Sequence, residues 1–403
     1  MTGQGGKVII AGGRVYDPSS NVNGEVRDVE IVGGEIFNPA TGKPIPHEGA
    51  LDASGCVVMA GAIDVHSHPI GVSRLARFSG FEELAGYADL GETVRKYLSM
   101  GCTYFVEAGL SPNEVESAQD ECEKQNIACS ILPLGEVVGV DRPAKFVCEK
   151  GVEEFFKQPD DGVAHHVHLP HLAKGDSLNY LEQFLKRLAG RRCHLSHISY
   201  YAFEKGNVAG AKAAEMISEY PNVTVDCGPI VFGPALTFTA DEGLSERVML
   251  AGGGGIFGDD KSVFSASPYL FQKSNILNAE FWINGMEFLL SSKNLSAVSL
   301  SIDYPSGGDI LGIPFIIACL MDSGLRGKFL ETLSASSPAL KNSGREFSLY
   351  EIAIVTRHAP SLVIGRNGGG AVIYEEDRDF EKMFAQARHV ITGGGKWKLT
   401  ESR

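Results

Sequence analysis

Residues 57–68 read VVMAGAIDVHSH, an apolar and β-branched run that ends in Asp-Val and two histidines spaced two apart. A run of this kind is typical of a strand that helices cover on both faces. Because side chains two apart in a strand point to the same side, His66 and His68 can reach one metal ion beyond its end. Such a pair also occurs by chance, but active sites of β/α barrels are built at strand ends, which favours a functional interpretation.

Further strands and helices alternate downstream of this run. The expected strands are Val57–Val65, Thr103–Glu107, Ala128–Leu132, Val163–His168, Cys193–Ile198, Val223–Cys227 and Val298–Ile302. The expected helices are Leu90–Met100, Pro112–Gln125, Val152–Gln158, Ser177–Leu188, Val208–Tyr220, Ala279–Ser292 and Ile313–Met321. This alternation predicts an α/β protein with a (β/α)8-type barrel. Its fourth strand is degenerate, since residues 135–162 offer one helix and only Lys145–Cys148 as a strand.

Both ends of the chain differ from this pattern. Residues 1–55 contain short β segments separated by Gly, Asn, Asp and Pro, and Ala371–Tyr374 and His389–Thr392 are β-rich as well. Because chain termini often lie close together, we expect one small β domain built from both ends. The predicted division is 1–55 and 361–403 for this β domain, and 56–360 for the catalytic barrel.

Composition excludes several classes of function. The chain has 403 residues, 43% of them hydrophobic, and a formal charge of −14, which disfavours binding to nucleic acid or to anionic lipid. The sequence shows no apolar stretch long enough to span a membrane and no secretion signal at its start. Its eight cysteines are scattered singly, as expected for buried thiols in the cytoplasm.

More candidate ligands follow later strands. In AHHVHLPH (164–171), alternation places His166 and His168 on one side and His165 on the other, so His168, nearest the strand end, is the preferred ligand. In CHLSHI (193–198), His197 is preferred and His194 is expected to pack in the interior. Asp303, directly after a buried β run, completes the set.

Imidazole and carboxylate ligands at successive strand ends suit zinc and leave room for a bound water. The metal would lower the pKa of that water, and Asp303 could bind the metal and accept the proton as hydroxide attacks a carbonyl.

The same pattern resembles the amidohydrolase superfamily. Within it, the chain resembles the A subunits of formylmethanofuran dehydrogenases and of bacterial formyltransferase/hydrolase complexes. The stretches that carry this resemblance run nearly end to end: LDASGCVVMAGAIDVHSH (51–68), DCGPIVFGPALTFTAD (226–241), ILNAEFWINGMEFLL (276–290), SIDYPSGGDILGIPFIIACLMDS (301–323) and REFSLYEIAIVTRHAP (345–360).

The resemblance implies a binuclear zinc centre that hydrolyses the N-formyl group of a methanofuran-like carrier, in a chain that works with other subunits of such a complex. His66 and His68 match the first-strand pair of the family, and His168 and His197 match the fifth- and sixth-strand histidines. Asp303 matches the eighth-strand acid that transfers protons.

The sequence departs from the family where the metal-bridging carboxylated lysine is expected. No I-K-V-V-N-P-G run is present, and Lys145, Glu107 and His171 are the substitutes that remain open. The family sequence after the last strand is also altered, to Asp303-Tyr304-Pro305-Ser306-Gly307. Two divalent ions without a bridging anion repel each other strongly, so we expect at most one well-occupied zinc unless a substitute bridge is present.

Two other functions remain open from the sequence. One is a paralogue without turnover that serves as a structural scaffold within the complex, and the other is a different amide or cyclic-amide hydrolase. Binding of an acidic carrier would need a local basic patch, for which Arg74, Arg77, Arg142 and Lys145 are candidates.

Overall fold

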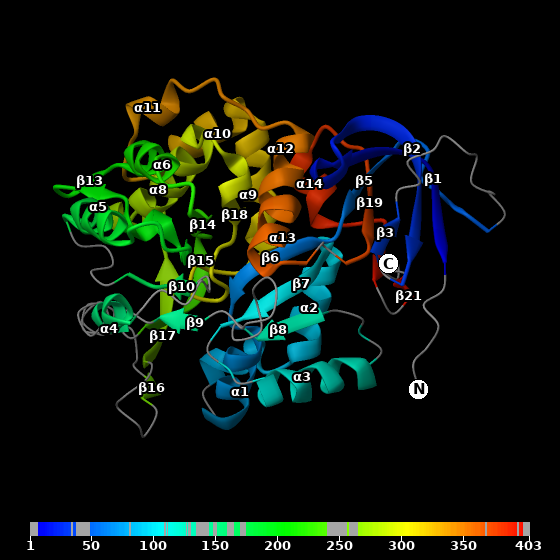
Figure 1. The fold of residues 1–403 in the computed structure, drawn as a ribbon, viewed down its shortest axis with the longest axis horizontal. Helices are drawn as coiled ribbons and strands as arrows, with labels where there is room; N and C mark the ends of the chain where they lie inside the picture. Colours follow the sequence, from blue (N-terminus) through cyan, green and yellow to red (C-terminus); the bar gives the residue numbers. More distant parts are fainter. Residues whose placement is uncertain are drawn as a thin grey trace.

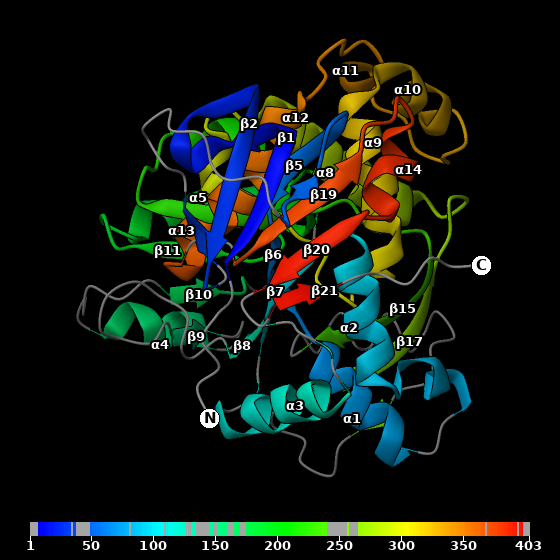
Figure 2. The ribbon, with the colours of Figure 1, turned by 90° about the vertical axis from the view of Figure 1, so that its right-hand side faces the viewer.

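Strands from both ends of the chain pair in one mixed sheet in the computed structural model (Figures 1 and 2). Its order is β21 (Gly395–Trp397), β20 (His389–Thr392), β19 (Ala371–Glu375), β5 (Cys56–Ala60), β1 (Val8–Asp17), β2 (Val22–Val32) and β3 (Glu35–Phe37), and β4 (Leu51–Asp52) pairs with β1. The structure describes residues 7–33, 35–37, 49–79, 82–108, 110, 112–125, 127, 130–133, 145–147, 151–158, 165–169, 175–239, 256–257, 265–366, 369–392 and 395–397.

Eight further strands run parallel in two groups. The first group is β6 (Ala62–Ser67), β7 (Cys102–Glu107) and β8 (Ser130–Pro133). The second is β9 (Lys145–Val147), β10 (His165–Val167), β11 (Cys193–Leu195), β14 (Val223–Cys227) and β18 (Val298–Leu300). A parallel bridge between Ser67 and Tyr304 joins β6 to the chain just after β18. The candidate fourth strand is therefore present as β9, three residues long.

Helices follow most of these strands and cover them. They are α1 (Pro69–Ser79), α2 (Leu90–Ser99), α3 (Pro112–Lys124), α4 (Val152–Lys157), α5 (Ser177–Arg187), α6 (Gly210–Ser218), α8 (Ile276–Ser291), α9 (Ile313–Met321), α10 (Ser323–Leu330), α11 (Pro338–Lys341), α12 (Leu349–Ala353), α13 (Ala359–Ile364) and α14 (Phe380–Ala385). A π-helical turn, Ile354–His358, joins α12 to α13.

Local sequence explains where several helices begin. The side chain of Asp89 accepts the backbone N–H of Glu92 at the start of α2, and Asn275 caps α8 in the same way. Helix α8 is apolar almost all round, which fits its position between neighbouring helices and strands. Its Trp282 and Phe288 are among the largest fully buried side chains of the main core.

The run Val57–Val65 is two strands rather than the single strand that we expected. Its first part, β5, pairs with β1 and β19 of the terminal sheet, whereas β6 belongs to the parallel group. The chain passes from one to the other at Gly61, where a Cβ atom would lie 2.0 Å from Thr103 Oγ1 and 2.7 Å from Gly369 O. A glycine is needed here because the two sheets approach too closely for any side chain.

An antiparallel group that the sequence analysis did not anticipate follows β14. It consists of β15 (Gly233–Thr239), β17 (Ser265–Phe271) and β16 (Ile256–Phe257), and it extends from the base of the molecule in the view of Figure 1. The short strands β12 (Phe203–Glu204) and β13 (Asn207–Val208) form a hairpin before α6.

Within the described residues, no single helix has the length and apolarity to cross a membrane. The segments Ile310–Met321 and Ser323–Leu330 pass a length and composition test only as a pair, with a 113° bend between them.

The close contact at Gly61 predicts a specific loss of stability. We expect Gly61→Ala to lower the free energy of unfolding by about 1–3 kcal/mol, the usual cost of overpacking. Gly327→Ala is the matched control, because Gly327 lies inside α10 and a Cβ there would have no neighbouring atom within 4 Å. That variant should be neutral or gain up to about 1 kcal/mol. Urea unfolding of both variants measures the difference, and equal stability would contradict the proposed contact.

Candidate metal centre

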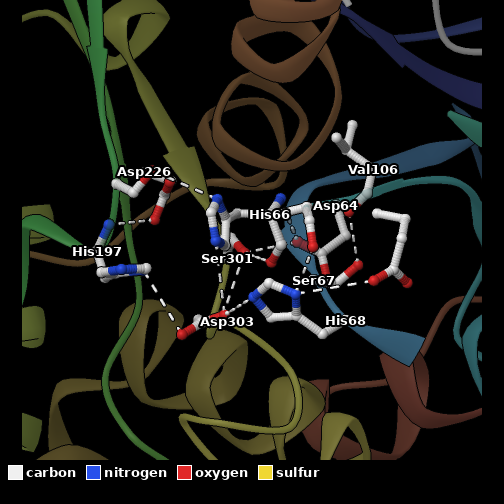
Figure 3. Close-up of polar contacts among 12 residues, drawn as sticks. Asp64, His66, Ser67, His68, Val106, His197, Asp226, Ser301 and Asp303 are labelled. Atoms are coloured by element: carbon white, nitrogen blue, oxygen red, sulfur yellow. Dashed lines mark hydrogen bonds and ion pairs between the residues drawn. The ribbon is translucent and has the colours of Figure 1, made fainter. Parts of the chain in front are cut away.

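The five predicted ligands lie together at the ends of four strands (Figure 3). Asp303 Oδ1 is 3.7 Å from His66 Nε2 and 3.3 Å from His68 Nε2. Asp303 Oδ2 is 3.7 Å from His197 Nδ1. The rings of His168 and His197 have centroids 4.4 Å apart, and those of His66 and His168 are 4.7 Å apart. Residues separated by up to 237 positions thus converge on one carboxylate, where the sequence predicted a metal site.

Their ligand atoms form two overlapping groups. His66, His168 and His197 form one, and His66, His68 and Asp303 form the other, with all ligand atoms of a group within 4.8 Å of one another. All five residues are buried or, for His68, partly buried. His66 Nε2, His197 Nδ1 and Asp303 Oδ1 are buried and make no hydrogen bond to the described residues. Unsatisfied buried polar atoms are costly, so their convergence fits a bound cation.

His68 is held by groups on both sides of its ring. Its Nδ1 lies 2.7 Å from the carbonyl oxygen of Ala108 and 3.7 Å from Glu107 Oε1, so Nδ1 carries a proton and donates it to the carbonyl. Burial lowers the pKa of His68, but its contacts with Asp303 and Glu107 outweigh burial and raise that pKa to about 10. In the absence of a cation, His68 and Asp303 therefore form an ion pair, and a metal ion would replace the Nε2 proton.

Burial lowers the pKa values of His66 and His168 well below the ordinary histidine value, and the neighbouring histidines lower them further. Both rings are therefore neutral at physiological pH, which is the state in which imidazole binds a metal. Burial raises the pKa of Asp303, but the charges of His197 and His68 outweigh it and keep that pKa below its usual value.

Asp303 sits in a tight turn after β18. Its backbone has φ of 55°, a left-handed conformation that is unfavourable for most side chains, and its carbonyl accepts the N–H of Gly307 at 3.0 Å. A Cβ on Gly307 would lie 1.9 Å from the carbonyl oxygen of Ile302, so this position requires glycine. The carbonyl of the next residue, Tyr304, accepts the N–H of His68 at 2.7 Å, which connects the Asp303 turn directly to the HxH segment.

A buried hydrogen-bond network supports β6 from below. Asp64, two residues before His66, accepts hydrogen bonds from Ser301 Oγ at 2.6 Å and from the Tyr97 hydroxyl at 2.9 Å. Burial raises the pKa of Asp64 to about 7 despite these bonds. Ser301 lies two residues before Asp303 on the same side, so the network ties the strand that carries His66 to the one that carries Asp303.

A second network surrounds His197, whose backbone is also left-handed (φ 39°). Its N–H donates to Asp226 Oδ1 at 2.6 Å, and Asp226 Oδ2 lies 3.2 Å from His194 Nε2. His194 Nδ1 lies 2.9 Å from Thr224 Oγ1. Burial lowers the pKa of His194 to about 3 and raises that of Asp226 to about 7. His194 is thus an interior residue, but a hydrogen-bonded one rather than simple packing.

The remaining predicted residues lie elsewhere. The ring of His165 packs on Phe155 of α4, which is the helix-facing position expected for it. Glu107 caps the start of α1, with Oε2 accepting the N–H of Ile70 at 2.8 Å, and faces the ring nitrogen of His68 that points away from Asp303. Lys145 pairs in register with His165, so its backbone lies three residues before the level of His168. His171 falls outside the described residues.

The predicted basic patch is not assembled. Arg74 pairs with Glu114 at 2.7 Å, and Arg77 pairs with Glu121 at 2.7 Å, so both guanidinium groups are neutralised by α3. Arg142 lies outside the described residues, as does the side chain of Lys145.

Sequence reasoning missed Asp64, Asp226 and the two serines beside the site. Strand period two could have found Asp64, which shares a side with His66 and His68. Asp226 stands out as the charged residue in the buried run VTVDC (223–227). No sequence signal shows that its partner would be the backbone of a residue on the neighbouring strand.

Comparison with protein-family models gives no match. The A subunit of the formyltransferase/hydrolase complex Fhc of Methylorubrum extorquens is 28% identical over 490 residues, covering 96% of this chain and 87% of the relative. Protein FwdA of Methanocaldococcus jannaschii is 23% identical over 497 residues, with the same coverage. Both alignments are longer than the 403 residues of this chain, so the relatives contain insertions that it lacks.

Solved structures show the same fold. The chain superposes on a chain of the formyltransferase/hydrolase complex FhcABCD from Methylorubrum extorquens, crystallised with methylofuran, with a TM-score of 0.74, 24% identity and coverage of 97% and 88%. D-Aminoacylase, described as an amidohydrolase with a binuclear metal centre, gives a TM-score of 0.50 at 12% identity, with 98% of each chain covered. This chain therefore has the α/β fold of the amidohydrolase superfamily and resembles, over nearly its whole length, the A subunits of formyltransferase/hydrolase complexes.

Proposed function

We propose that this protein is a zinc-dependent hydrolase of a formamide-type C–N bond, acting on the N-formyl group of a methanofuran-like carrier. The observation that carries the proposal is the position of the Asp303 carboxylate, within 3.3–3.7 Å of nitrogens of His66, His68 and His197. The relative from Methylorubrum extorquens, whose complex was crystallised with methylofuran, supports the carrier class.

The donor set fits zinc. His66, His68, His168, His197 and Asp303 would hold the ion, since imidazole nitrogen and carboxylate oxygen are among the ligands that zinc prefers. When bound, zinc lowers the pKa of a coordinated water and polarises a carbonyl. The fit rests on the buried atoms His66 Nε2, His197 Nδ1 and Asp303 Oδ1, which make no hydrogen bonds to the described residues.

In the proposed reaction, water adds to the formyl carbon, the C–N bond breaks, and the products are formate and the carrier amine. Asp303 accepts the proton of the attacking water at a carboxylate oxygen and delivers it to the leaving nitrogen. One carboxylate can serve both steps because the proton it takes is the one that the amine needs. His68, donating to the carbonyl of Ala108, stays in a fixed orientation beside Asp303 throughout.

The metal count follows from which anions face the cluster. Asp303 is the anion between the two overlapping ligand groups. Glu107 approaches His68 from the Nδ1 side and therefore supports that ring rather than bridging two ions. Lys145 has its backbone at the level of His165, below the strand ends. We therefore propose one well-occupied zinc site per chain.

Three wider features belong to the same proposal. The two groups of parallel strands form one (β/α)8-type barrel of residues 56–360, flanked by a β domain of 1–55 and 361–403. The chain works with the other subunits of a formyltransferase/hydrolase-type complex, as its relative in Methylorubrum extorquens is named for. The compartment is the cytoplasm, supported by buried free thiols at Cys56, Cys102, Cys122, Cys193, Cys227 and Cys319.

Replacing Asp303 tests the proton-transfer role. We expect Asp303→Asn to lower the rate of formate release from an N-formylated furfurylamine carrier by about 10²–10⁴-fold, because Asn cannot accept the proton. Asp309→Asn is the matched control in the same loop, since Asp309 only accepts the N–H of Leu311. Formate is measured enzymatically over time. Unchanged turnover in Asp303→Asn would remove Asp303 from the mechanism, and a wild-type chain without turnover would favour the scaffold paralogue instead.

Metal analysis tests the number of sites. Purified protein, kept free of chelators, is expected to contain about one equivalent of zinc. Because His66 belongs to both ligand groups, His66→Ala should lose it, whereas His165→Ala, which changes a helix-facing ring, should keep it. Plasma emission spectrometry after desalting gives the counts. Two equivalents in the wild type would show that another anion bridges the ions.

The pH dependence of zinc binding follows from His68. Because Asp303 and Glu107 raise the pKa of His68 to about 10, the metal must displace a proton from Nε2 at any lower pH. The apparent affinity of the apoprotein for zinc should therefore rise about tenfold per pH unit between about pH 6 and 8. Competition with a chromophoric chelator, corrected for the chelator's own titration, measures it. A pH-independent affinity would show that His68 is not a ligand.

A further inference from the structure

Asp226 contacts a candidate ligand through its backbone instead of its side chain. It lies on β14, fully buried, one strand away from His197, and its Oδ1 accepts the His197 N–H at 2.6 Å (Figure 3). Charge-assisted hydrogen bonds of this length are stronger than those between neutral groups. Asp226 is not a member of either ligand group.

His197 needs such a partner because its backbone is strained. With φ 39° and ψ 54° it occupies the left-handed region, which costs a non-glycine residue about 1–2 kcal/mol. This conformation ends β11 and turns the chain into the 3-10 segment Ile198–Tyr201. The direction of the His197 side chain depends on this turn, so the group that stabilises the turn also sets where Nδ1 points.

The other oxygen of Asp226 is fixed in turn. Its Oδ2 lies 3.2 Å from His194 Nε2, and His194 Nδ1 lies 2.9 Å from Thr224 Oγ1. Since the carboxylate only accepts, Nε2 carries the proton and the threonine hydroxyl donates to Nδ1. Both Asp226 oxygens and both His194 nitrogens are then satisfied, so the carboxylate cannot rotate without breaking a bond.

We propose that Asp226, held by His194, is a positioning residue that sets the left-handed turn at His197 and thereby aims its Nδ1 at the metal beside Asp303. This inference rests on the proposed function, because it takes His197 to be a ligand. It assigns to Asp226 no contact with substrate, water or metal. Groups that orient metal ligands in this way contribute about 10–100-fold to metal affinity.

The test measures the metal site directly, without turnover. Zinc affinity of the apoprotein is determined by chelator competition for the wild type, Asp226→Ala and Asp226→Asn, and the visible spectrum of the cobalt-substituted protein reports ligand geometry. We expect Asp226→Ala to weaken zinc binding by about 10–100-fold and to change the cobalt spectrum. Asp226→Asn keeps an oxygen for the His197 N–H, and His194 can adopt its other tautomer, so its affinity should stay within about threefold of wild type.

Glu287→Gln is the matched control for loss of a buried carboxylate. Glu287 lies on α8 and is hydrogen-bonded to Ser337, with no contact to the ligands among the described residues. It should leave zinc affinity and the cobalt spectrum unchanged. Circular dichroism establishes that each variant is folded, and if Asp226→Ala is not, Asp226→Ser replaces it, because the shorter hydroxyl cannot span the same distance.

The outcomes separate the two proposals. Wild-type apoprotein that binds no zinc overturns the proposed function and this inference with it. Wild-type binding with an unchanged Asp226→Ala variant overturns the inference alone. A folded Asp226→Asn variant that loses as much affinity as Asp226→Ala also overturns it, since charge rather than the hydrogen bond to His197 would then be responsible.

Discussion

A single carboxylate, that of Asp303, is surrounded by imidazole rings inside the protein, and the arrangement of the centre depends on it. Burying a charge is unfavourable unless opposite charge and hydrogen bonds accompany it. Here the accompanying imidazoles of His66, His68 and His197 come from two other strands and approach within 3.7 Å. Without a cation, His68 supplies the positive charge by keeping its proton; with one, the metal replaces that proton. Either state keeps the cluster electrically balanced, so the geometry is compatible with both.

The side chains beneath the cluster are unusual for a parallel-strand core. Interiors of β/α barrels are generally filled by branched aliphatic residues. In this protein, positions two residues before the ligands hold Asp64, His166 and Ser301, and their neighbours include His194 and Asp226. The rings of His166 and His194 lie 4.6 Å apart, and with Thr224 they line a cavity of about 130 Å³. Polar contacts thus replace part of the apolar packing, and they fix the strand ends in orientation as well as in position.

The sequence predicted the site better than it predicted the joints of the fold. His66, His68, His168, His197 and Asp303 could be found because strand periodicity and position at strand ends are local properties. Helices such as Pro112–Lys124 and Ile313–Met321 followed from periodicity for the same reason. The break at Gly61 could not be found, since it depends on Thr103 and Gly369, which reach that point only in the folded chain. The role of Asp226 depends likewise on a backbone N–H of another strand.

The sheet that both termini share has a consequence for the order of assembly during synthesis. Val58 pairs with Ile373, so β5 gains that neighbour only after several hundred further residues have been translated. At roughly 5–20 residues per second this takes tens of seconds. Throughout that interval β1, β2 and β5 have no partner on the β19 side, and apolar side chains such as Val58 lack part of their final cover. Completion of the nascent chain, rather than any local folding step, therefore sets the earliest moment at which the sheet can close.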